Sequence, residues 1–592
     1  MATVLLDWVG AGSRGLLLAT LLLLGACGGG SGVGAGDLGT EDGEPEDFSE
    51  QRREPLRGSL GTGTGTARDE GRVVDPYALS ALLVASAAEP PVQNSTALAG
   101  ALGSDGRPQG AAASLRDLSF TRPASWPPAS ATDASRLPLP RSIQSTSYAG
   151  AYEPDRLLSD GSLQPVPAWT EGWTLALDGR KASWARYVNN PRASGTCPAG
   201  TTLIGRFAER YGALSADETN RFLGAGVEDD YDLCELPARY EAGATLTLSA
   251  DNVYRLPESG STIAPRIAAN GQRTRSTLTI AAGTLLVAPA GSRLTVEPSA
   301  ELVVSGSPLA PVTFTAEAQI EARFDDEAAT DAEGLPGGWG GLVLLDETRT
   351  SACAGTGCPV ASEEGLGAFG GTGDAGSTRA PQALHRVQYL VLRNAGAPLA
   401  DGSPQPALSL FGIGRGTRGT GSTAISTDFN FIQLHRNAGD AVRVRGGNAF
   451  LAHLLATGNG GSALRYADGW TGGLQFLLAI PEAGSGADAV VGSGRDSAEP
   501  ISFPLLANLT VLGPASAGPA VQALRIERGS RLQLWNSVLA GDFSEGCLDL
   551  DDALTFNRAA EAGGQPPDAP GPHLFIRNSR LDCLAVSVNE NG

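Results

Sequence analysis

The segment Phe429-Asn-Phe-Ile-Gln-Leu-His-Arg-Asn-Ala-Gly-Asp440 recurs 22 residues later as Leu451-Ala-His-Leu-Leu-Ala-Thr-Gly-Asn-Gly-Gly-Ser462. The alignment places Asn437 on Asn459. A repeat of this length, built from short apolar runs and polar turns, is typical of one coil of a β-solenoid. Each coil of such a fold buries its inward side chains only against neighbouring coils, so the core grows along an axis.

The repeat continues beyond the turn, because Ala441-Val-Arg-Val-Arg-Gly446 falls on Ala463-Leu-Arg-Tyr-Ala-Asp468. We expect Arg443 and Arg465 to stack on one face. We also expect the two aligned asparagines to lie at turns in left-handed backbone, which asparagine tolerates, and to form an amide ladder. A β-sandwich with loose internal similarity is the alternative fold.

The second half of the chain carries the same pattern elsewhere. Runs of three to five residues with alternating apolar positions, typical of strands, are separated by spacers too short for crossover helices. They include Thr277–Ile280, Leu285–Val287, Arg293–Val296, Glu301–Val304 and Val312–Thr315. Helical periodicity is absent there, so the sequence predicts a mainly β fold.

A series of motifs in a specific order resembles one protein family. This family is a set of bacterial exported lipoproteins with a right-handed parallel β-helix, similar in fold to pectate lyases, and the resemblance covers roughly residues 195–590. It implies the fold and the exported location, but no reaction, because the members of the family have no established common activity. The motifs are Cys197–Thr201, Leu246–Tyr254, Leu278–Leu285, Ala310–Thr315, Gly338–Leu344, Leu408–Gly416, Gly469–Phe476, Ala507–Leu512 and Cys547–Leu550.

Two aromatic stretches, Tyr148–Tyr152 and Trp169–Thr174, resemble the terminal piece of this family but come before the solenoid here. This placement predicts that residues 145–185 pack against one end of the solenoid as a cap.

The N-terminus resembles a lipoprotein export signal. The apolar run Leu16–Leu24 is too short to span a bilayer and ends in Gly25-Ala-Cys27, which resembles the lipobox. The resemblance implies removal of residues 1–26, acylation (palmitate among the acyl groups) of Cys27, and insertion of the acyl chains into a lipid bilayer. Gly28 in place of an aspartate favours the outer membrane, at its periplasmic face or at the cell surface.

The remaining boundaries follow composition. Residues 27–144 are rich in Gly, Pro and acidic side chains. This composition predicts a low-complexity tether that is mainly disordered and in part ordered. Residues 145–243 predict a capping region with a short helix near Arg206–Phe222, and residues 244–592 predict the parallel β-helix. We expect long loops at 321–338, 346–383 and 556–571.

Lipidation of Cys27 leaves six cysteines, an even number, in a chain sent to an oxidising compartment. The simplest of their fifteen possible connectivities is local pairing: Cys197 with Cys234, Cys353 with Cys358, and Cys547 with Cys583.

Charge narrows the range of partners. The chain carries 43 basic and 64 acidic residues, a net charge of −21, which disfavours nucleic acid. The expected partners are the bilayer through Cys27 and either a polysaccharide or an outer-membrane protein.

Chemistry-bearing residues are few. The candidate catalytic residues are Asp440 and Asp468, with Arg443 and Arg465 one repeat apart as bases, and Arg445 beside them. The alternative interpretation is that these are solvated outward positions. The four histidines lack ligand spacing, so we expect no metal and no cofactor.

Three function classes stay open. We favour a non-catalytic envelope lipoprotein that binds through one face or the long loops of its solenoid. The alternatives are a carbohydrate-active enzyme of the polysaccharide lyase or glycoside hydrolase type, and a structural element of the envelope.

Overall fold

The computed structural model describes most of the chain after residue 195 and short parts before it. The described residues are 67–69, 72–74, 121–126, 144, 146–153, 156–158, 163–164, 166, 168–170, 173–175, 196–212, 231–321, 336–353, 358–371, 383–418, 425–482, 485–513, 521–541, 543–555, 574–577 and 579–583. The predicted signal peptide and Cys27 lie outside them, as do most of the predicted tether and parts of the predicted long loops. Among the described residues, no helix is long and apolar enough to cross a membrane.

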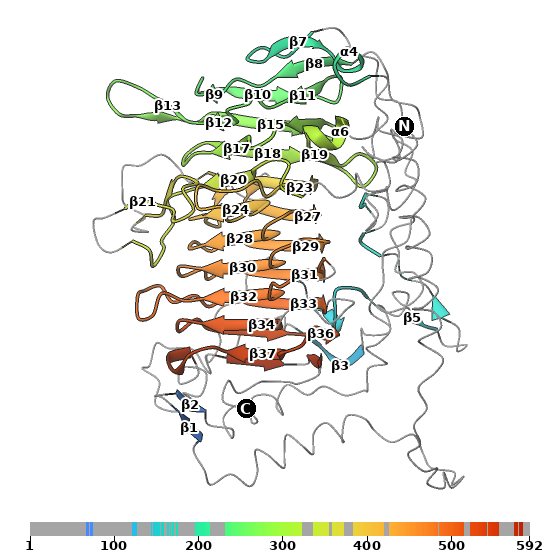
Figure 1. Cartoon of the computed structure of the whole chain (residues 1–592), viewed down its shortest axis with the longest axis vertical. Coiled ribbons are helices and arrows are strands. Elements are labelled where there is room, and N and C mark those ends of the chain that lie inside the picture. Colours follow the sequence, from blue (N-terminus) through green and yellow to red (C-terminus); the bar gives the residue numbers. More distant parts are fainter. Residues whose placement is uncertain are drawn as a thin grey trace, which may run out of the picture. The chain divides into compact units, whose positions relative to one another are not determined.

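The chain forms a parallel β-helix in which three ladders of strands run along the coil axis (Figure 1). This confirms the predicted mainly β fold and rules out the β-sandwich. One ladder is the ten-stranded sheet β9 (Arg239–Tyr240), β12 (Ser261–Ile263), β17 (Arg293–Val296), β20 (Gly341–Leu345), β24 (Leu408–Phe411), β28 (Val442–Arg445), β30 (Leu464–Ala467), β32 (Val490–Ser493), β34 (Gln522–Glu527) and β37 (Gly546–Leu550).

The other two ladders share five long strands. These are β23 (Arg386–Arg393), β27 (Asp428–His435), β29 (Phe450–Thr457), β31 (Gly473–Ile480) and β33 (Leu505–Leu512). On both sides of this stretch the ladders separate. One continues as β10 (Thr245–Leu248), β15 (Thr277–Ala281), β18 (Glu301–Ser305), β35 (Leu532–Trp535) and β38 (Leu574–Arg577). The second continues as β8 (Asp232–Glu235), β11 (Val253–Arg255), β16 (Leu285–Ala288), β19 (Val312–Ala316), β36 (Val538–Gly541) and β39 (Arg580–Cys583).

Each long strand bends at one residue in left-handed backbone. Together with Asn536, the residue between β35 and β36, these form a column that we call the bend ladder: Tyr389, Phe431, His453, Phe476, Asn508 and Asn536. The four rings stack face to face, with centroid distances of 4.4, 4.3 and 4.6 Å. A left-handed non-glycine residue is uncommon, so six in one column mark a structural corner of the coil.

The predicted repeat is confirmed residue by residue. In the parallel pairing of β27 with β29, Phe429 lies beside Leu451, and in that of β28 with β30, Arg443 lies beside Arg465. The amide ladder is also present, because Asn437 Nδ2 donates to Asn459 Oδ1 at 2.7 Å. The expected left-handed backbone was wrong by one position. It belongs to the preceding residues, Arg436 and Gly458, which make the turn and leave the asparagines free to hydrogen-bond across coils.

The apolar core fills the inside of the coil. Alternate strand positions point inward, for example Leu278 and Ile280 in β15 and Leu294 and Val296 in β17, and all are fully buried. The ladders begin with β8, earlier than the predicted boundary at residue 244.

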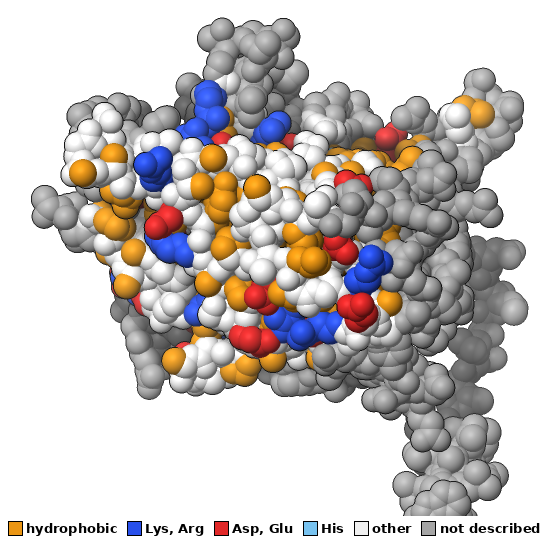
Figure 2. Space-filling model, turned by 90° about the horizontal axis from the view of Figure 1, so that it is seen from above, with side chains coloured by type: hydrophobic (Ala, Val, Ile, Leu, Met, Phe, Trp, Pro, Cys, Tyr) orange, Lys and Arg blue, Asp and Glu red, His pale blue; other side chains and the backbone are white. Residues whose placement is uncertain are grey.

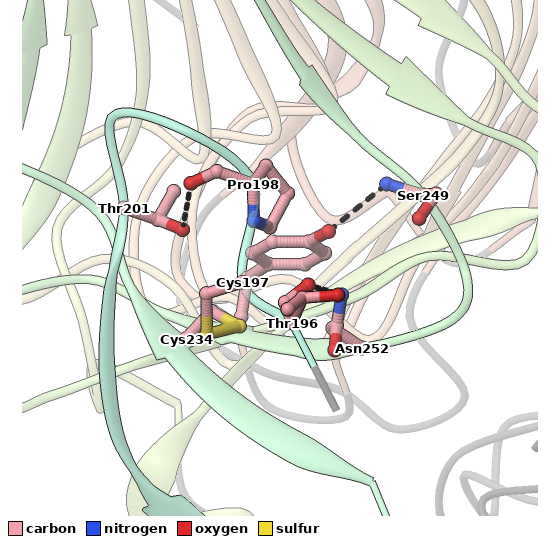
Figure 3. The surroundings of a disulfide bond; sticks show 8 residues. Thr196, Cys197, Pro198, Thr201, Cys234, Ser249 and Asn252 are labelled. Atoms are coloured by element: carbon pink, nitrogen blue, oxygen red, sulfur yellow. Dashed lines mark hydrogen bonds between the residues drawn. A yellow bond between two sulfur atoms is a disulfide. The ribbon is translucent and has the colours of Figure 1, made fainter. Parts of the chain in front are cut away.

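The N-terminal end of the solenoid carries a cap. The strand β7 (Thr202–Arg206) pairs antiparallel with β8, and the short helix α4 (Phe207–Tyr211) follows it. The Cys197–Cys234 disulfide ties the cap to β8 beside Asn252, whose side chain donates to Thr196 O (Figure 3). The cap thus covers the first strand edge and lies within the predicted capping region, residues 145–243.

Ion pairs strengthen this attachment. Glu317, at the start of helix α6 (Glu317–Glu321), accepts hydrogen bonds from Tyr211 of the cap and from Arg255 of β11. Seen from the cap end (Figure 2), hydrophobic, basic and acidic side chains are interspersed among the described residues. The other two disulfides join Cys353 to Cys358 and Cys547 to Cys583, the pairs that the sequence predicts.

Six further strands form small antiparallel hairpins off the coil: β13 (Arg266–Ile267) with β14 (Arg273–Thr274), β21 (Val360–Ala361) with β22 (Ala368–Phe369), and β25 (Thr417–Arg418) with β26 (Ile425–Ser426). Before the cap, β1 (Ala67–Asp69) pairs with β2 (Arg72–Val74), β3 (Thr121–Trp126) with β4 (Thr146–Tyr148), and β5 (Arg156–Leu157) with β6 (Leu163–Gln164).

The prediction that residues 145–185 pack against one end of the solenoid was wrong. Their described part contacts the side of the coil, from Asn536 near its C-terminal end to Val391 of β23. We call the described residues of 144–153 and 168–175 the strap. Its side-on position follows from the outward side chains of the long strands, which are apolar or carry amides and so need a cover.

Candidate functional site

The structure brings the predicted candidates, including Arg445, together on the outside of the ten-stranded sheet. Asp440 precedes β28, Arg443 lies on it, Arg465 lies beside Arg443 on β30, and Asp468 follows β30. The interpretation as solvated positions was wrong for the two carboxylates, because Asp440 is only 4% exposed and Asp468 is 3% exposed.

Asp440 uses both of its oxygens. Its Oδ2 lies 2.6 Å from Arg443 Nη2 and 3.0 Å from Arg465 Nε, and its Oδ1 accepts the Ser462 backbone N–H at 3.0 Å. Burial raises the pKa of Asp440, but the guanidiniums of Arg465 and Arg443 outweigh this effect and hold the pKa below its ordinary value. Asp440 is therefore an ionised acceptor across the neutral pH range.

Asp468 is held by a different pair of arginines. Its Oδ2 lies 2.6 Å from Arg445 Nε and its Oδ1 lies 3.0 Å from Arg495 Nε. Its backbone carbonyl accepts hydrogen bonds from Thr350 Oγ1 and Ser351 N, so the residue also anchors the loop after β20.

Two glutamates from that loop complete the site. Glu364 lies 2.7 Å from Arg445 and 3.3 Å from Arg443, and Glu363 lies 2.9 Å from Arg495. Glu364 is largely buried, whereas the side chain of Glu363 is 73% exposed. Both come from the turn between β21 and β22, and we call residues 358–371 the clamp hairpin.

Apolar contacts hold the clamp hairpin against the sheet. Leu366 and Phe369 pack against Val343 and Leu345 of β20 and against Phe411 of β24. The Arg445 guanidinium lies 5.4 Å from the centre of the Phe369 ring and 5.8 Å from that of Phe411. Burial lowers the pKa of Arg445, but Asp468 and Glu364 outweigh it and raise the pKa above its ordinary value.

The whole site, which we call the arginine–carboxylate cluster, balances its formal charges. It consists of Glu363, Glu364, Asp440, Arg443, Arg445, Arg465, Asp468 and Arg495. Three members of the cluster, Glu363, Glu364 and Arg495, were not predicted from the sequence. The glutamates lie about 80 residues from Arg443, outside the repeat, and only the fold places them there.

The described histidines are not grouped as ligands. His385 and His435 are fully buried, and burial lowers the pKa of both, that of His385 to about 3. His453 belongs to the bend ladder, and burial lowers its pKa to about 4. His573 lies outside the described residues. In the part of the chain that the structure describes, no group of three or more His, Cys, Asp or Glu could hold a metal ion.

Comparison with known proteins adds one match. The family model described as a pectate-lyase like beta helix domain matches residues 240–563, a range that contains the arginine–carboxylate cluster. No curated protein and no solved structure matches the chain.

Proposed function

We propose that this chain, which belongs to the family of pectate-lyase-like β-helix domains, is an exported, lipid-anchored protein. We propose further that it binds a partner in the outer membrane or on the cell surface and does not catalyse a reaction on it. The family establishes the fold of this part of the chain. The anchoring rests on the lipobox-like sequence ending in Cys27.

The observation that carries the non-catalytic role is the pairing within the arginine–carboxylate cluster. A general acid needs a carboxyl group that holds a proton near neutral pH. Asp440 has a lowered pKa and accepts hydrogen bonds through both oxygens. The four guanidinium groups of the cluster form ion pairs with its four carboxylates. Because two of these carboxylates, Glu363 and Glu364, belong to the clamp hairpin, the ion pairs hold the hairpin on the sheet.

The same cluster offers a binding surface. The side chains of Arg465 and Arg495 are each about one third exposed, and among the described residues their hydrogen bonds use Nε and Nη2. Guanidinium groups make strong paired hydrogen bonds to carboxylate and phosphate. We therefore assign this surface to a partner that presents anionic groups, either on a polysaccharide or on an outer-membrane protein.

Affinity electrophoresis of the protein without its signal peptide, in gels that contain anionic or neutral polysaccharides, tests this proposal. Retention by an anionic polymer should weaken about tenfold when Arg465 and Arg495 are both changed to Ala. Arg528→Ala is the control, because the Arg528 side chain is exposed and lies 3.4 Å from its partner Asp496, which is exposed as well. A parallel pull-down with purified outer-membrane proteins covers the protein partner. Unchanged retention of every ligand by the double variant would refute the assigned surface.

A further inference from the structure

One outward column of the long strands is buried although it points away from the core. Register places these residues side by side across six coils, and each is at most 2% exposed: Val391, Gln433, Leu455, Leu478, Thr510 and Val538. Four of the six are aliphatic. An outward face of this composition needs a cover, and the strap supplies it.

Two glutamine side chains bind the strap through its backbone. Gln433 donates to Leu175 O at 2.8 Å and accepts from Leu175 N at 2.7 Å. Gln475 makes the same pair with Gln144, at 2.8 and 2.7 Å. Each glutamine amide thus bonds to both the backbone N–H and the backbone C=O of one strap residue, as a neighbouring strand would. Such a contact binds a peptide backbone whatever side chain that residue carries.

Asparagine and threonine side chains extend this contact. Asn508 Nδ2 donates to the carbonyls of Tyr148 and Gly150, and Thr510 Oγ1 accepts from Ala151 N. Asn508 is fully buried and Thr510 is nearly so. Buried amides left without partners are costly, so this face requires a peptide or another polar occupant.

The strap adds an aromatic pair. Trp173 packs edge-on against Tyr389 and Phe431 of the bend ladder, and Trp169 packs edge-on against His453. Their indole N–H groups donate within the strap, to Trp169 O and Ala151 O. The indoles therefore contribute apolar and quadrupole contact to the solenoid, which suits an aromatic anchor.

Leu175 of the strap lies 258 residues from Gln433 along the sequence, so the strap contacts the solenoid as a separate peptide segment would. We propose that this side of the solenoid is a peptide-binding groove, filled here in cis by the strap, and that it accepts in trans a peptide that carries the same aromatic pair. This inference does not depend on lipid anchoring or on the arginine–carboxylate cluster.

The test uses the full chain with a protease recognition site inserted between residues 176 and 195. After folding and cleavage, the N-terminal fragment that contains the strap should co-elute with the solenoid in size-exclusion chromatography. A fluorescent synthetic peptide of residues 144–175 in excess should then replace it, with a rise in anisotropy that saturates.

Variants on both partners separate recognition from folding. Gln433→Ala with Gln475→Ala should weaken peptide binding at least tenfold, whereas Gln388→Ala, an exposed glutamine on β23 that does not contact the strap, should leave it unchanged. A peptide with Trp169→Ala and Trp173→Ala should fail to bind the unaltered solenoid, and this result cannot be attributed to misfolding. The groove would be refuted by equal binding of both peptides. Loss of the solenoid's thermal transition when the strap leaves, or no exchange over several days, would also refute it.

Discussion

Asn437 and Asn459 occupy the same position in adjacent coils, and the side-chain amide of the first donates to the side-chain oxygen of the second at 2.7 Å. Asn459 also donates to Leu434 O, and Asn437 accepts from Ala395 N. Both side chains are buried. The pair thus links three coils through buried side-chain amides.

We predict that Asn459→Ala lowers the free energy of unfolding by about 1–3 kcal/mol, because it leaves the buried amide of Asn437 without an acceptor. Urea unfolding followed by circular dichroism measures the change. In a double-mutant cycle, Asn437→Ala should cost less in the Asn459→Ala background than alone. Additive effects of the two substitutions would show that the ladder contributes no coupling.

The two glutamates of the clamp hairpin should respond differently to substitution. Glu364→Gln removes the charge of a largely buried side chain and replaces one of the two oxygens that accept from Arg443 and Arg445 by an NH2 group, so it should destabilise attachment of the hairpin by about 1–3 kcal/mol. Glu363→Gln, at an exposed position, should cost less than about 1 kcal/mol and serves as the matched control. Limited proteolysis within residues 358–371 measures hairpin opening. Equal protection of both variants would contradict the role given to Glu364.

Asp346 directly follows β20, and its titration should make the stability of the fold depend on pH. Burial raises its pKa from an ordinary 3.8 to about 7, and no partner is found for its Oδ2 among the described atoms. The folded state therefore binds more protons than the unfolded state between about pH 4 and pH 7, and stability falls as pH rises through this window.

Asp346→Asn removes that titration. Relative to the unsubstituted protein, the variant should gain stability as pH rises from 5 to 8, by up to about 1.4 kcal/mol per pH unit within the window. Urea midpoints of both proteins at pH 5 and pH 8 measure the difference. Comparing the two proteins at the same pH cancels the contributions of His385 and His453, whose lowered pKa values make stability rise with pH below about pH 6.5. A pH-independent difference between the two proteins would contradict the prediction.

The lipid anchor is tested separately from the fold. Metabolic labelling with a palmitate analogue should tag the unsubstituted protein, and Cys27→Ala should abolish the label and release the protein from the membrane fraction. Two or three acyl chains would hold it firmly, since each buried methylene contributes about 0.8 kcal/mol. Label that persists in the variant would rule out Cys27 as the acylation site.

Much of the fold follows from the sequence because a solenoid repeats its constraints. The offset between Phe429 and Leu451 reproduces the observed register, and local cysteine pairing reproduces the disulfides. The position of the strap does not follow from the repeat. A signal for it existed in β31, where Gly473–Ile480 is buried on both faces and is apolar apart from Gln475.

The arginine–carboxylate cluster was predictable only in its repeated part. Stacking of Arg443 on Arg465 follows from the coil length. Glu363 and Glu364 lie on the clamp hairpin. The position of this hairpin depends on the packing of Leu366 and Phe369 against apolar side chains of β20 and β24. Since that contact is tertiary and not periodic, the sequence pattern carries no trace of it.

The most direct test of the central claim, binding without turnover, is an activity assay on the purified protein without its signal peptide. It should be incubated with uronate-containing and neutral polysaccharides, with and without calcium, and the products assayed for unsaturated ends and new reducing ends. We predict no product above the level given by Asp440→Asn. Product formation that is lost on Asp440→Asn or Arg465→Ala, in variants that keep the native thermal transition, would contradict the claim and identify an enzyme.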